Sequence, residues 1–301
     1  MTHDTMTLIT AEDRAAARKP ITVAVDGSEH NRSAVAWASF EARATGRELV
    51  LLTAIDDHLT ALPYFTISNQ DERALDMLSG VRNSIRHLVD DGSVHTEAVV
   101  GAPAAVLVER AALAHLMVVG RRGLGSFGRM IVGSTSIAVA GRAAAPTVIV
   151  PDSWRQEDQV GAAIVVGVNP YRPEHALLQT AFARARRTGS PLTAVHGWEA
   201  PTAYAADQAS TAGPVTGWEE ASNEFDRVLD DWRSRFPQVE LVTVHAHSHP
   251  AMAVLEAAAG TAQLVILGRH TRGRLSGFAF GSVTRAVLHY ADCPVMVVPD
   301  S

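Results

Sequence analysis

The chain has 301 residues, of which 47% are hydrophobic and 19% are charged, and its formal net charge is −6. The length predicts about two domains of typical size. The net negative charge and the lack of a cluster of basic residues argue against non-specific binding to nucleic acid phosphates. The single cysteine, Cys293, cannot form an internal disulfide, and no apolar run reaches membrane-spanning length. We therefore expect a soluble cytoplasmic protein that binds neither nucleic acid nor membranes.

The first half alternates short apolar runs with helical patterns, after a polar stretch at 1–19 that we expect to be a tail. Strands are expected at 21–28, 48–56, 94–100, 115–120 and 147–151, and helices at 31–45, 70–91, 103–114 and 134–142, with an irregular stretch at 57–69. This unit, residues 20–152, is the first expected domain.

The second half repeats this order after a linker at 153–162. Strands are expected at 164–169, 191–199, 239–246, 263–268 and 295–299, and helices at 174–188, 218–236, 250–259 and 282–290, with a long loop at 200–217. The second expected domain is residues 163–301.

Strands that alternate with helices and are apolar on both faces predict parallel sheets covered on both sides. Right-handed crossovers then give each half a doubly wound, Rossmann-like α/β fold with a five-stranded parallel sheet. In such a fold, ligands bind outside the carboxyl ends of the strands. Asp26 and Gly120 both fall at such ends, so we expect them to lie near each other.

A long sequence pattern occurs twice, at 116–152 and 264–300, without a gap and at a fixed offset of 148 residues. Each copy is an apolar run ending in Gly, an Arg- and Gly-rich loop, a Gly-Ser pair opening a helical stretch, and a strand ending in Pro-Asp. Such an internal duplication predicts two domains of the same fold.

The glycines of the first copy predict an anion-binding loop. Gly120 lets the chain leave its strand beside a ligand with no Cβ in the way. Gly123 tolerates a positive φ that turns successive N–H groups toward one point, an anion nest. Gly133 and Ser134 start a helix whose free N–H groups and positive dipole end face a phosphate.

Side chains of this loop can add to phosphate binding. Ser134 and Ser136 offer hydroxyl donors, and Arg121, Arg122 and Arg129 are candidates to neutralise the phosphates, with solvated surface arginines as the simpler interpretation. The loop sequence does not indicate how many phosphate groups are bound, so the choice between AMP and ATP stays open.

The spacing Gly120-x2-Gly123-x9-Gly133-Ser134 resembles the nucleotide loop of the ATP-binding universal stress proteins, G-x2-G-x9-G-[ST]. The VDGS at 25–28 and the two terminal strands ending in Pro-Asp are also similar to that family. Because the resemblance covers both halves, the chain resembles the tandem universal stress proteins of actinobacteria. The resemblance implies adenine nucleotide alpha hydrolase-like domains, ATP as the cofactor with or without Mg²⁺, and a nucleotide-gated stress-response regulator that acts through conformation and protein partners.

The resemblance also assigns the site. It places Asp26 beside the adenosine and lines the adenine pocket with Val25 and Ala54. The cofactor-binding residues that it implies for the first half are Val25, Asp26, Ala54, Gly120, Arg122, Gly123, Gly133, Ser134, Thr135 and Ser136. It further implies that the last strands, 147–151 and 295–299, pair across a pseudo-twofold axis, which makes the chain an internal dimer able to form a homodimer.

The second half departs from the motif. Asn169, Pro170 and Tyr171 replace the Asp-Gly-Ser of the first half, and Thr271 stands at the middle glycine position. A Thr in a positive-φ turn is costly, and a proline removes a backbone donor. The corresponding candidates are Asn169, Gly197, Gly268, Gly281, Ser282, Val283 and Thr284. Two interpretations stay open here, an altered nucleotide site and a structural copy.

Other constellations give weaker hypotheses. His245, His247 and His249 alternate as metal ligands on a strand would, but the run passes from strand into loop, so we interpret them as surface or pocket-edge histidines. Trp198, Trp218 and Trp232 are interpreted as core or interface residues. We therefore assign no metal ligand.

Enzyme signatures are missing from the sequence. There is no G-x4-G-K-[ST] loop and no G-x-S-x-G elbow, so we expect no catalytic residue and at most slow ATP hydrolysis. The alternative functions are a slow ATPase or phosphotransferase and a nucleotide-free scaffold.

Overall fold

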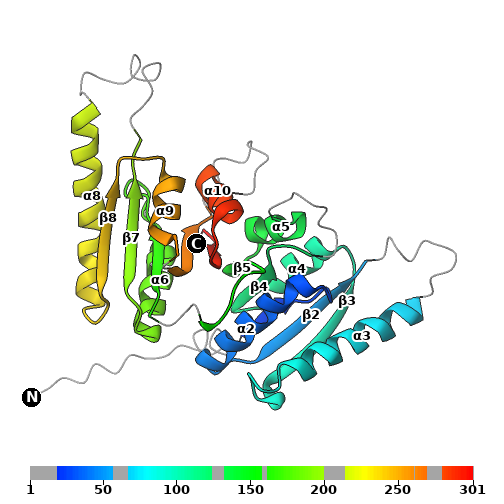
Figure 1. The fold of residues 1–301 in the computed structure, drawn as a ribbon. Helices are drawn as coiled ribbons and strands as arrows, with labels where there is room; N and C mark the ends of the chain where they lie inside the picture. Colours follow the sequence, from blue (N-terminus) through cyan, green and yellow to red (C-terminus); the bar gives the residue numbers. More distant parts are fainter. Residues whose placement is uncertain are drawn as a thin grey trace, which may run out of the picture.

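The computed structural model describes residues 19–56, 67–123, 132–157, 161–199, 214–260, 262–269 and 280–300 (Figure 1). The strands of these residues form one ten-stranded sheet in the order β3-β2-β1-β4-β5-β10-β9-β6-β7-β8. The two halves of the chain therefore share a single sheet, joined in its middle by the last strand of each half.

The first half is a five-stranded parallel sheet, as expected. Its strands are β1 (Ile21–Ala24), β2 (Leu49–Ile55), β3 (Val94–Val100), β4 (Leu116–Gly120) and β5 (Thr147–Val150). Its helices are α2 (Arg32–Thr45), α3 (Ile67–Ser84), α4 (Pro103–Ala111) and α5 (Ser134–Arg142), with the short 3-10 helices η1 (Glu29–Asn31) and η3 (Asp91–Ser93).

The second half repeats this topology, again with parallel strands. Its strands are β6 (Ala163–Gly167), β7 (Leu192–Gly197), β8 (Leu241–Ala246), β9 (Ala262–Gly268) and β10 (Val295–Val298). Its helices are α6 (His175–Thr188), α8 (Pro214–Arg235), α9 (Pro250–Ala258) and α10 (Ser282–Tyr290).

Several elements end earlier than expected: β1 ends at Ala24 rather than 28, and α4 ends at Ala111 rather than 114. Two helices differ more strongly. α3 begins at Ile67, inside the stretch expected to be irregular, and it ends at Ser84 rather than near residue 91. The chain folds back after α3 because Arg82 donates hydrogen bonds to the Asp91 side chain at 3.0 Å and to its carbonyl at 2.9 Å. α8 begins at Pro214, within the expected loop, where a proline suits the first turn of a helix. Residues 57–66 and 200–213 of these expected loops lie outside the described residues.

The halves meet through an antiparallel pair, β5 with β10. Val295, Met296 and Val297 pair with Ile149, Val148 and Thr147. The pairing implied by the family resemblance is thus confirmed. Every side chain of both strands is buried, and the pairing covers what would otherwise be an exposed edge on each half.

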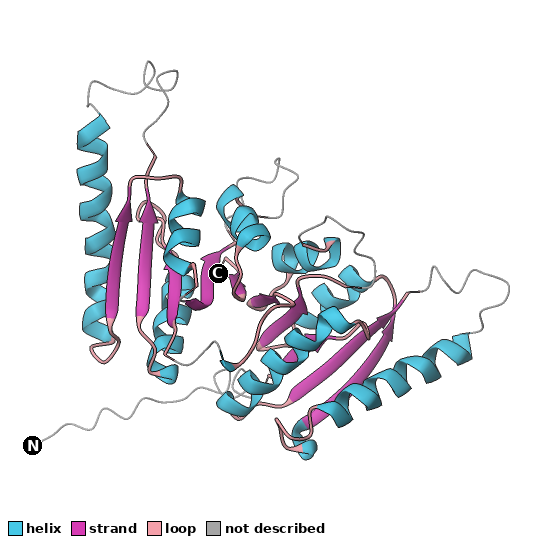
Figure 2. Cartoon of the chain, viewed as in Figure 1, coloured by secondary structure: helices cyan, strands magenta, loops and turns pink. Residues whose placement is uncertain are grey.

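Helices cover the sheet (Figure 2), and buried apolar side chains form two layers that each continue from one half into the other. One layer packs α2, α3, α6 and α8 on one face, and the other packs α4, α5, α9 and α10 on the opposite face. Phe182 and Phe225 are fully buried in the first layer, and burying a side chain of this size stabilises the fold by about 1.5–3 kcal/mol. Trp154, in the segment expected to be a linker, is also buried there and packs on Phe40.

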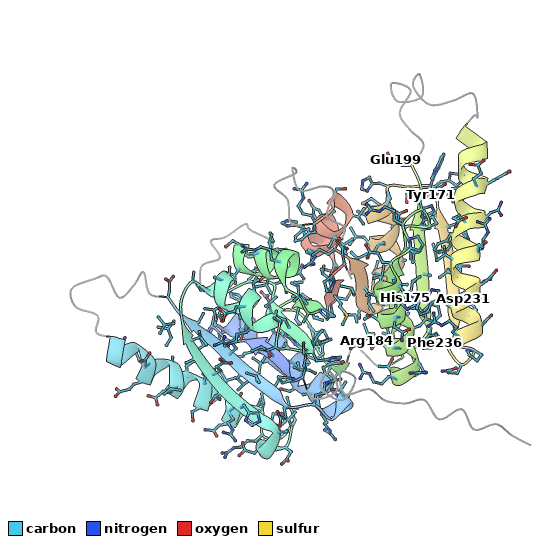
Figure 3. All side chains as sticks on the ribbon, turned by 180° about the vertical axis from the view of Figure 1, so that it is seen from behind. Tyr171, His175, Arg184, Glu199, Asp231 and Phe236 are labelled. Carbon is cyan, nitrogen blue, oxygen red and sulfur yellow. The ribbon has the colours of Figure 1, made fainter. Side chains whose placement is uncertain are left out.

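A buried ion-pair cluster joins α2 of the first half to α6 of the second. Arg184, labelled in Figure 3 where the halves meet, donates to both Glu41 carboxylate oxygens at 2.8 and 2.9 Å, and Arg187 donates at 2.6 Å. The Arg184 guanidinium also lies 5.3 Å from the centre of the Trp37 ring. Glu41 is 8% exposed, so this carboxylate depends on its two arginine partners.

Cys293 is half-buried, in agreement with an apolar filling role. Burial raises the pKa of its thiol to about 11. Because the thiolate is the reactive form, iodoacetamide at pH 8 should modify the folded protein about 100-fold more slowly than the urea-unfolded protein. Mass spectrometry of timed samples measures both rates, and equal rates would contradict the burial of this thiol.

None of the helices in the described part of the chain combines the length and the apolar character needed to cross a membrane.

Candidate functional site

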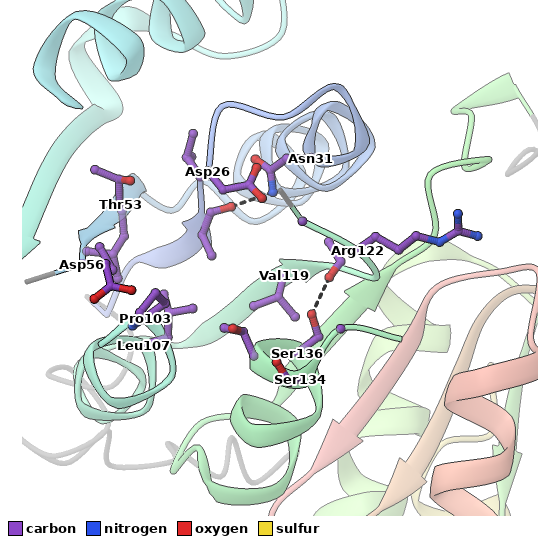
Figure 4. A pocket seen from close by; sticks show the side chains of 18 residues that line it. Asp26, Asn31, Thr53, Asp56, Pro103, Leu107, Val119, Arg122, Ser134 and Ser136 are labelled. Atoms are coloured by element: carbon purple, nitrogen blue, oxygen red, sulfur yellow. Dashed lines mark hydrogen bonds between the residues drawn. The ribbon is translucent and has the colours of Figure 1, made fainter. Parts of the chain in front are cut away.

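A pocket of about 660 Å³ opens at the carboxyl ends of β1, β2 and β4 (Figure 4). β1 lies between β2 and β4, and the chain leaves β1 toward the α2 face but leaves β4 toward the α5 face. This divergence is the topological switch point at which open α/β sheets bind ligands. All first-half residues implied by the family resemblance lie in the lining of this pocket, so the fold brings together residues 25–26, 54, 120, 122–123 and 133–136.

Asp26 is fixed against the glycine loop. One carboxylate oxygen accepts a hydrogen bond from the Ser28 backbone N–H at 2.9 Å, across the tight turn made by Gly27 at φ +75°. The other oxygen faces Gly123, where an added Cβ would come within 2.5 Å of it. The expected proximity of Asp26 to the loop after Gly120 is confirmed.

The reason for the glycine at 123 differs from the expectation. Gly123 does not have a positive φ, so the expected nest built on a left-handed residue at this position is wrong. Glycine is needed here because the Asp26 carboxylate takes the space of a side chain. The sequence alone shows a glycine but not what lies against it.

Hydrogen bonds hold the start of α5 on the end of β4. The Gly133 N–H donates to the Arg121 carbonyl at 2.8 Å, and the Ser136 hydroxyl donates to the Gly120 carbonyl at 2.7 Å. The Ser136 proton is therefore engaged within the protein, which corrects the expectation that it serves as a phosphate donor. Ser134 and Thr135 line the pocket at the first turn of α5, where backbone N–H groups have no partner within the helix.

The Arg122 side chain is not aimed at the pocket. The Arg122 side chain points away from Ser134 and Ser136, with its Nε 3.9 Å from an Asp152 carboxylate oxygen (Figure 4). His30 Nδ1 lies 3.0 Å from the same oxygen. Burial lowers the pKa of the Arg121 guanidinium, and the nearby Asp152 opposes this shift. Arg129 lies outside the described residues.

Several lining residues were missed from the sequence: Asn31, Thr53, Asp56, Pro103 and Leu107. Asn31 donates its amide to the Ala24 carbonyl at 2.9 Å and so braces the end of β1. Asp56 directly follows β2, and a polar residue at a strand end is a signal that could have identified it.

The comparisons with known proteins agree with this geometry. The model of the universal stress protein family matches residues 17–151 and 162–299. The chain belongs to the universal stress protein family. A universal stress protein of Mycolicibacterium smegmatis is 29% identical over 297 residues, covering 95% of this chain and 98% of its own. One from Mycobacterium tuberculosis is 29% identical over 294 residues, covering 93% of this chain and 97% of its own.

Comparison with solved structures also finds universal stress proteins. A universal stress protein crystal structure from Archaeoglobus fulgidus has a TM-score of 0.68 at 17% identity, and the match covers 95% of this chain and 98% of that one. The expected tandem of universal stress protein domains is confirmed.

The second half of this universal stress protein keeps the frame of the site. Asn169 Oδ1 accepts from the Tyr171 N–H at 3.1 Å, as Asp26 does with Ser28. Thr284 donates its hydroxyl to the Gly268 carbonyl at 3.0 Å, as Ser136 does to Gly120. α10 begins at Ser282 after Gly281, as α5 begins after Gly133, and Val283 follows in its first turn.

Protein atoms lie directly against two glycines of that frame. At Gly197, the counterpart of Ala54, an added Cβ would lie 2.5 Å from Pro250 Cα, because α9 packs directly on β7. At Gly268 an added Cβ would overlap the Glu174 carboxylate. Among the described residues this favours the structural copy over the altered nucleotide site. Thr271 lies outside them.

His245, His247 and His249 do not lie together on one face of a strand. β8 ends at Ala246, so His245 lies on the strand, whereas His249 accepts a hydrogen bond from the Ala251 N–H at the start of α9. The His247 ring lies against Trp218, tilted by 30°, with ring centres 3.5 Å apart. Within the described ranges no group of three His, Cys, Asp or Glu side chains could hold a metal ion.

Proposed function

We propose that the first half of this universal stress protein binds ATP, and that ATP occupancy regulates a protein partner in the stress response. The observation that supports this most is the pocket at the switch point, where Asp26 lies against Gly123 and the first turn of α5 faces the same space. Its volume of about 660 Å³ is in the range of small-molecule sites.

The walls of the pocket suit the parts of a nucleotide. The backbone N–H groups of Ser134 and Thr135 at the helix start would hold phosphate oxygens. Val25, Ala54 and Leu107 offer an apolar wall for a flat base. Asp26 offers carboxylate oxygen, the ligand type that Mg²⁺ prefers, and a bound Mg²⁺ would neutralise phosphate charge.

We propose regulation rather than turnover. In the described lining, the carboxylates that could act as bases are Asp26 and Asp56, and Asp26 is fixed by Ser28 on one side and Gly123 on the other. Efficient ATP hydrolysis requires a group that orients the attacking water. The ATPase alternative would gain support if Asp26→Ala abolished saturable turnover while ATP binding persisted.

A signal requires that ATP bind one conformation better than another. The site is well placed for such coupling, because α5 is followed by Ala143, whose carbonyl accepts a 2.7 Å hydrogen bond from Arg269 of the second half. A shift of α5 on nucleotide binding would therefore reach the other half. We place this regulation in the cytoplasm and propose that the internal pair associates further into a homodimer.

The test is to denature freshly purified protein and to quantify the released nucleotide by chromatography. We expect about one ATP per chain, because the first half offers a pocket of ligand size, whereas in the second half Pro250 and Glu174 lie directly against Gly197 and Gly268. A value near two would show that the second half also binds. No nucleotide, and none taken up on adding ATP, would overturn the proposal in favour of the nucleotide-free scaffold.

A further inference from the structure

Histidine and aromatic side chains of the second half lie together where α8 runs along β8 (Figure 1). His196 on β7 and His245 on β8 are partners in the register of this parallel pair. Both rings contact Phe225 of α8, with their centres 5.7 and 4.9 Å from the centre of the Phe225 ring. Trp218, about two turns earlier on α8, contacts the rings of His245 and His247. None of these residues lines the pocket of the first half.

We propose that His196 and His245 form an acid-sensitive contact that controls the N-terminal half of α8 (residues 214–225). While both imidazoles are neutral, this segment stays packed on β7 and β8, and protonation of the pair releases it. The release would expose Phe225, which is fully buried in the packed form. This response belongs to the second half and does not depend on whether the first half binds ATP.

The surroundings of His196 favour its neutral form. Its Nδ1 lies 3.3 Å from the Val168 carbonyl, and because a carbonyl only accepts, the neutral ring carries its proton on Nδ1. A second proton must therefore go to Nε2, which is buried and has no hydrogen-bond partner among the described residues. Burying an N–H of a charged ring without an acceptor is costly. Burial lowers the pKa of His196, the Val168 carbonyl opposes this shift, and His245 adds to it.

His245 is the member of the pair that solvent reaches. Its side chain is 24% exposed, and its Nε2 lies 3.4 Å from an Asp226 carboxylate oxygen. Its Nδ1, in contrast, is buried without a partner among the described residues. Because the two histidines are neighbours in register, a positive charge on His245 opposes a positive charge on His196. Both protons can be taken up together only when the rings move apart or reach water.

Other charged groups on the packed elements do not offset these charges. β6 has no titratable side chain. On α8, the described ion pairs besides Asp226 are internal to the helix: Glu224–Arg227, Asp230–Arg233 and Asp231–Arg235. The remaining acidic side chains at this end are exposed: Glu199, Glu219 and Glu220. On α6, His175 contacts Trp232 of α8. Asp226 is therefore the charged group that the described residues place against the pair.

The C-terminal half of α8 has its own packing. Leu229 is fully buried there, and Trp232 stacks on Phe182 and on Phe236. These contacts involve no group that titrates near neutral pH. We therefore expect acid to release the N-terminal half of α8 while the C-terminal half stays in place.

The direction of the pH dependence follows from the lowered pKa of His196. The released ring binds a proton more readily than the packed ring, so the packing is fully stable above the ordinary histidine pKa of about 6.5. The packing weakens as the pH falls from there toward the lowered value. If release takes up one proton, its equilibrium constant rises about tenfold for each pH unit in this range.

The test is hydrogen exchange of the full chain at pH 7.5 and pH 5.5, followed by mass spectrometry and corrected for the intrinsic exchange rate at each pH. We expect about tenfold less protection of residues 218–225 at pH 5.5, with little change in residues 230–235. Equal protection of residues 218–225 at both pH values would overturn the proposal. A uniform loss along the whole helix would overturn it as well, since it would indicate general acid unfolding.

Substitutions assign the response to the two histidines. His196→Gln and His245→Gln each remove a group that takes up a proton, so each should reduce the loss of protection in acid, and the double variant should abolish it. The change with pH is compared within each variant, so a less stable variant still gives an answer. The matched control is His87→Gln, an exposed histidine of the first half, which should respond as the wild type does. A double variant with the wild-type response would show that these histidines do not control α8.

Discussion

Replacing Gly123 with tryptophan is expected to weaken ATP binding by about 100-fold or more. The position has no room for a side chain, since even a Cβ would come within 2.5 Å of the Asp26 carboxylate. An indole must therefore either displace Asp26, which is held by Ser28, or project into the pocket and occupy ligand space. In either case the close contact between the Asp26 carboxylate and residue 123, or the space for the ligand, is lost. Calorimetric titration with ATP measures the loss.

The matched control for this change is Gly80→Trp. Gly80 lies on α3, and an ideal Cβ there meets no atom within 4 Å, so the same residue type is added without touching the pocket. The control should bind ATP as the wild type does. Unchanged binding in Gly123→Trp, with both variants folded by circular dichroism, would show that ATP binds elsewhere.

Replacing Glu41 with alanine is expected to lower the free energy of unfolding by about 3–5 kcal/mol, the cost of leaving buried charges without their partner. The variant strands Arg184, whose side chain is 10% exposed, at the contact between α2 and α6. Urea unfolding followed by fluorescence measures the change. Glu109→Ala, which removes one partner of a largely exposed ion pair with Arg110, is the control and should have little effect.

The stabilisation from Glu41 should also depend on pH. Burial alone would raise the pKa of Glu41, but Arg184 and Arg187 outweigh it and lower the pKa below the usual glutamate value. A lowered pKa means that the contribution is fully present above about pH 4.3, the unfolded value, and is lost as the pH falls through the folded value. The stability difference between wild type and Glu41→Ala should therefore be constant near neutrality and narrow in acid. A difference that widened in acid would contradict this assignment.

The regular parts of the fold could be predicted from the sequence because their signals are local. The Gly-Ser pairs place the starts of α5 and α10, and the bounds 134–142 and 282–290 agree with the structure. The strand ends also place Asp26 beside the loop after Gly120, because parallel strands end at a common edge.

The state of each site could not be predicted in this way, because it depends on contacts between distant segments. Glu174 covers Gly268, and Pro250 lies over Gly197, across separations that no local pattern encodes. Gly123 was identified correctly but for the wrong reason, since its neighbour Asp26 is remote in sequence. Asp56 lines the pocket but belongs to no sequence motif that would identify it.

The two halves belong to one chain and pair through β5 and β10, and this has a consequence for how the two binding sites can diverge. In a dimer of identical single-domain subunits, any substitution in one binding site appears in the other as well. Here the partner is encoded separately within the same chain, so Glu174 and Gly197 can change one half while Asn31 and Ala54 stay in the other. Because the two halves are encoded separately, a substitution in one half need not occur in the other. One half can therefore lose its binding site and still pair with the half that keeps one.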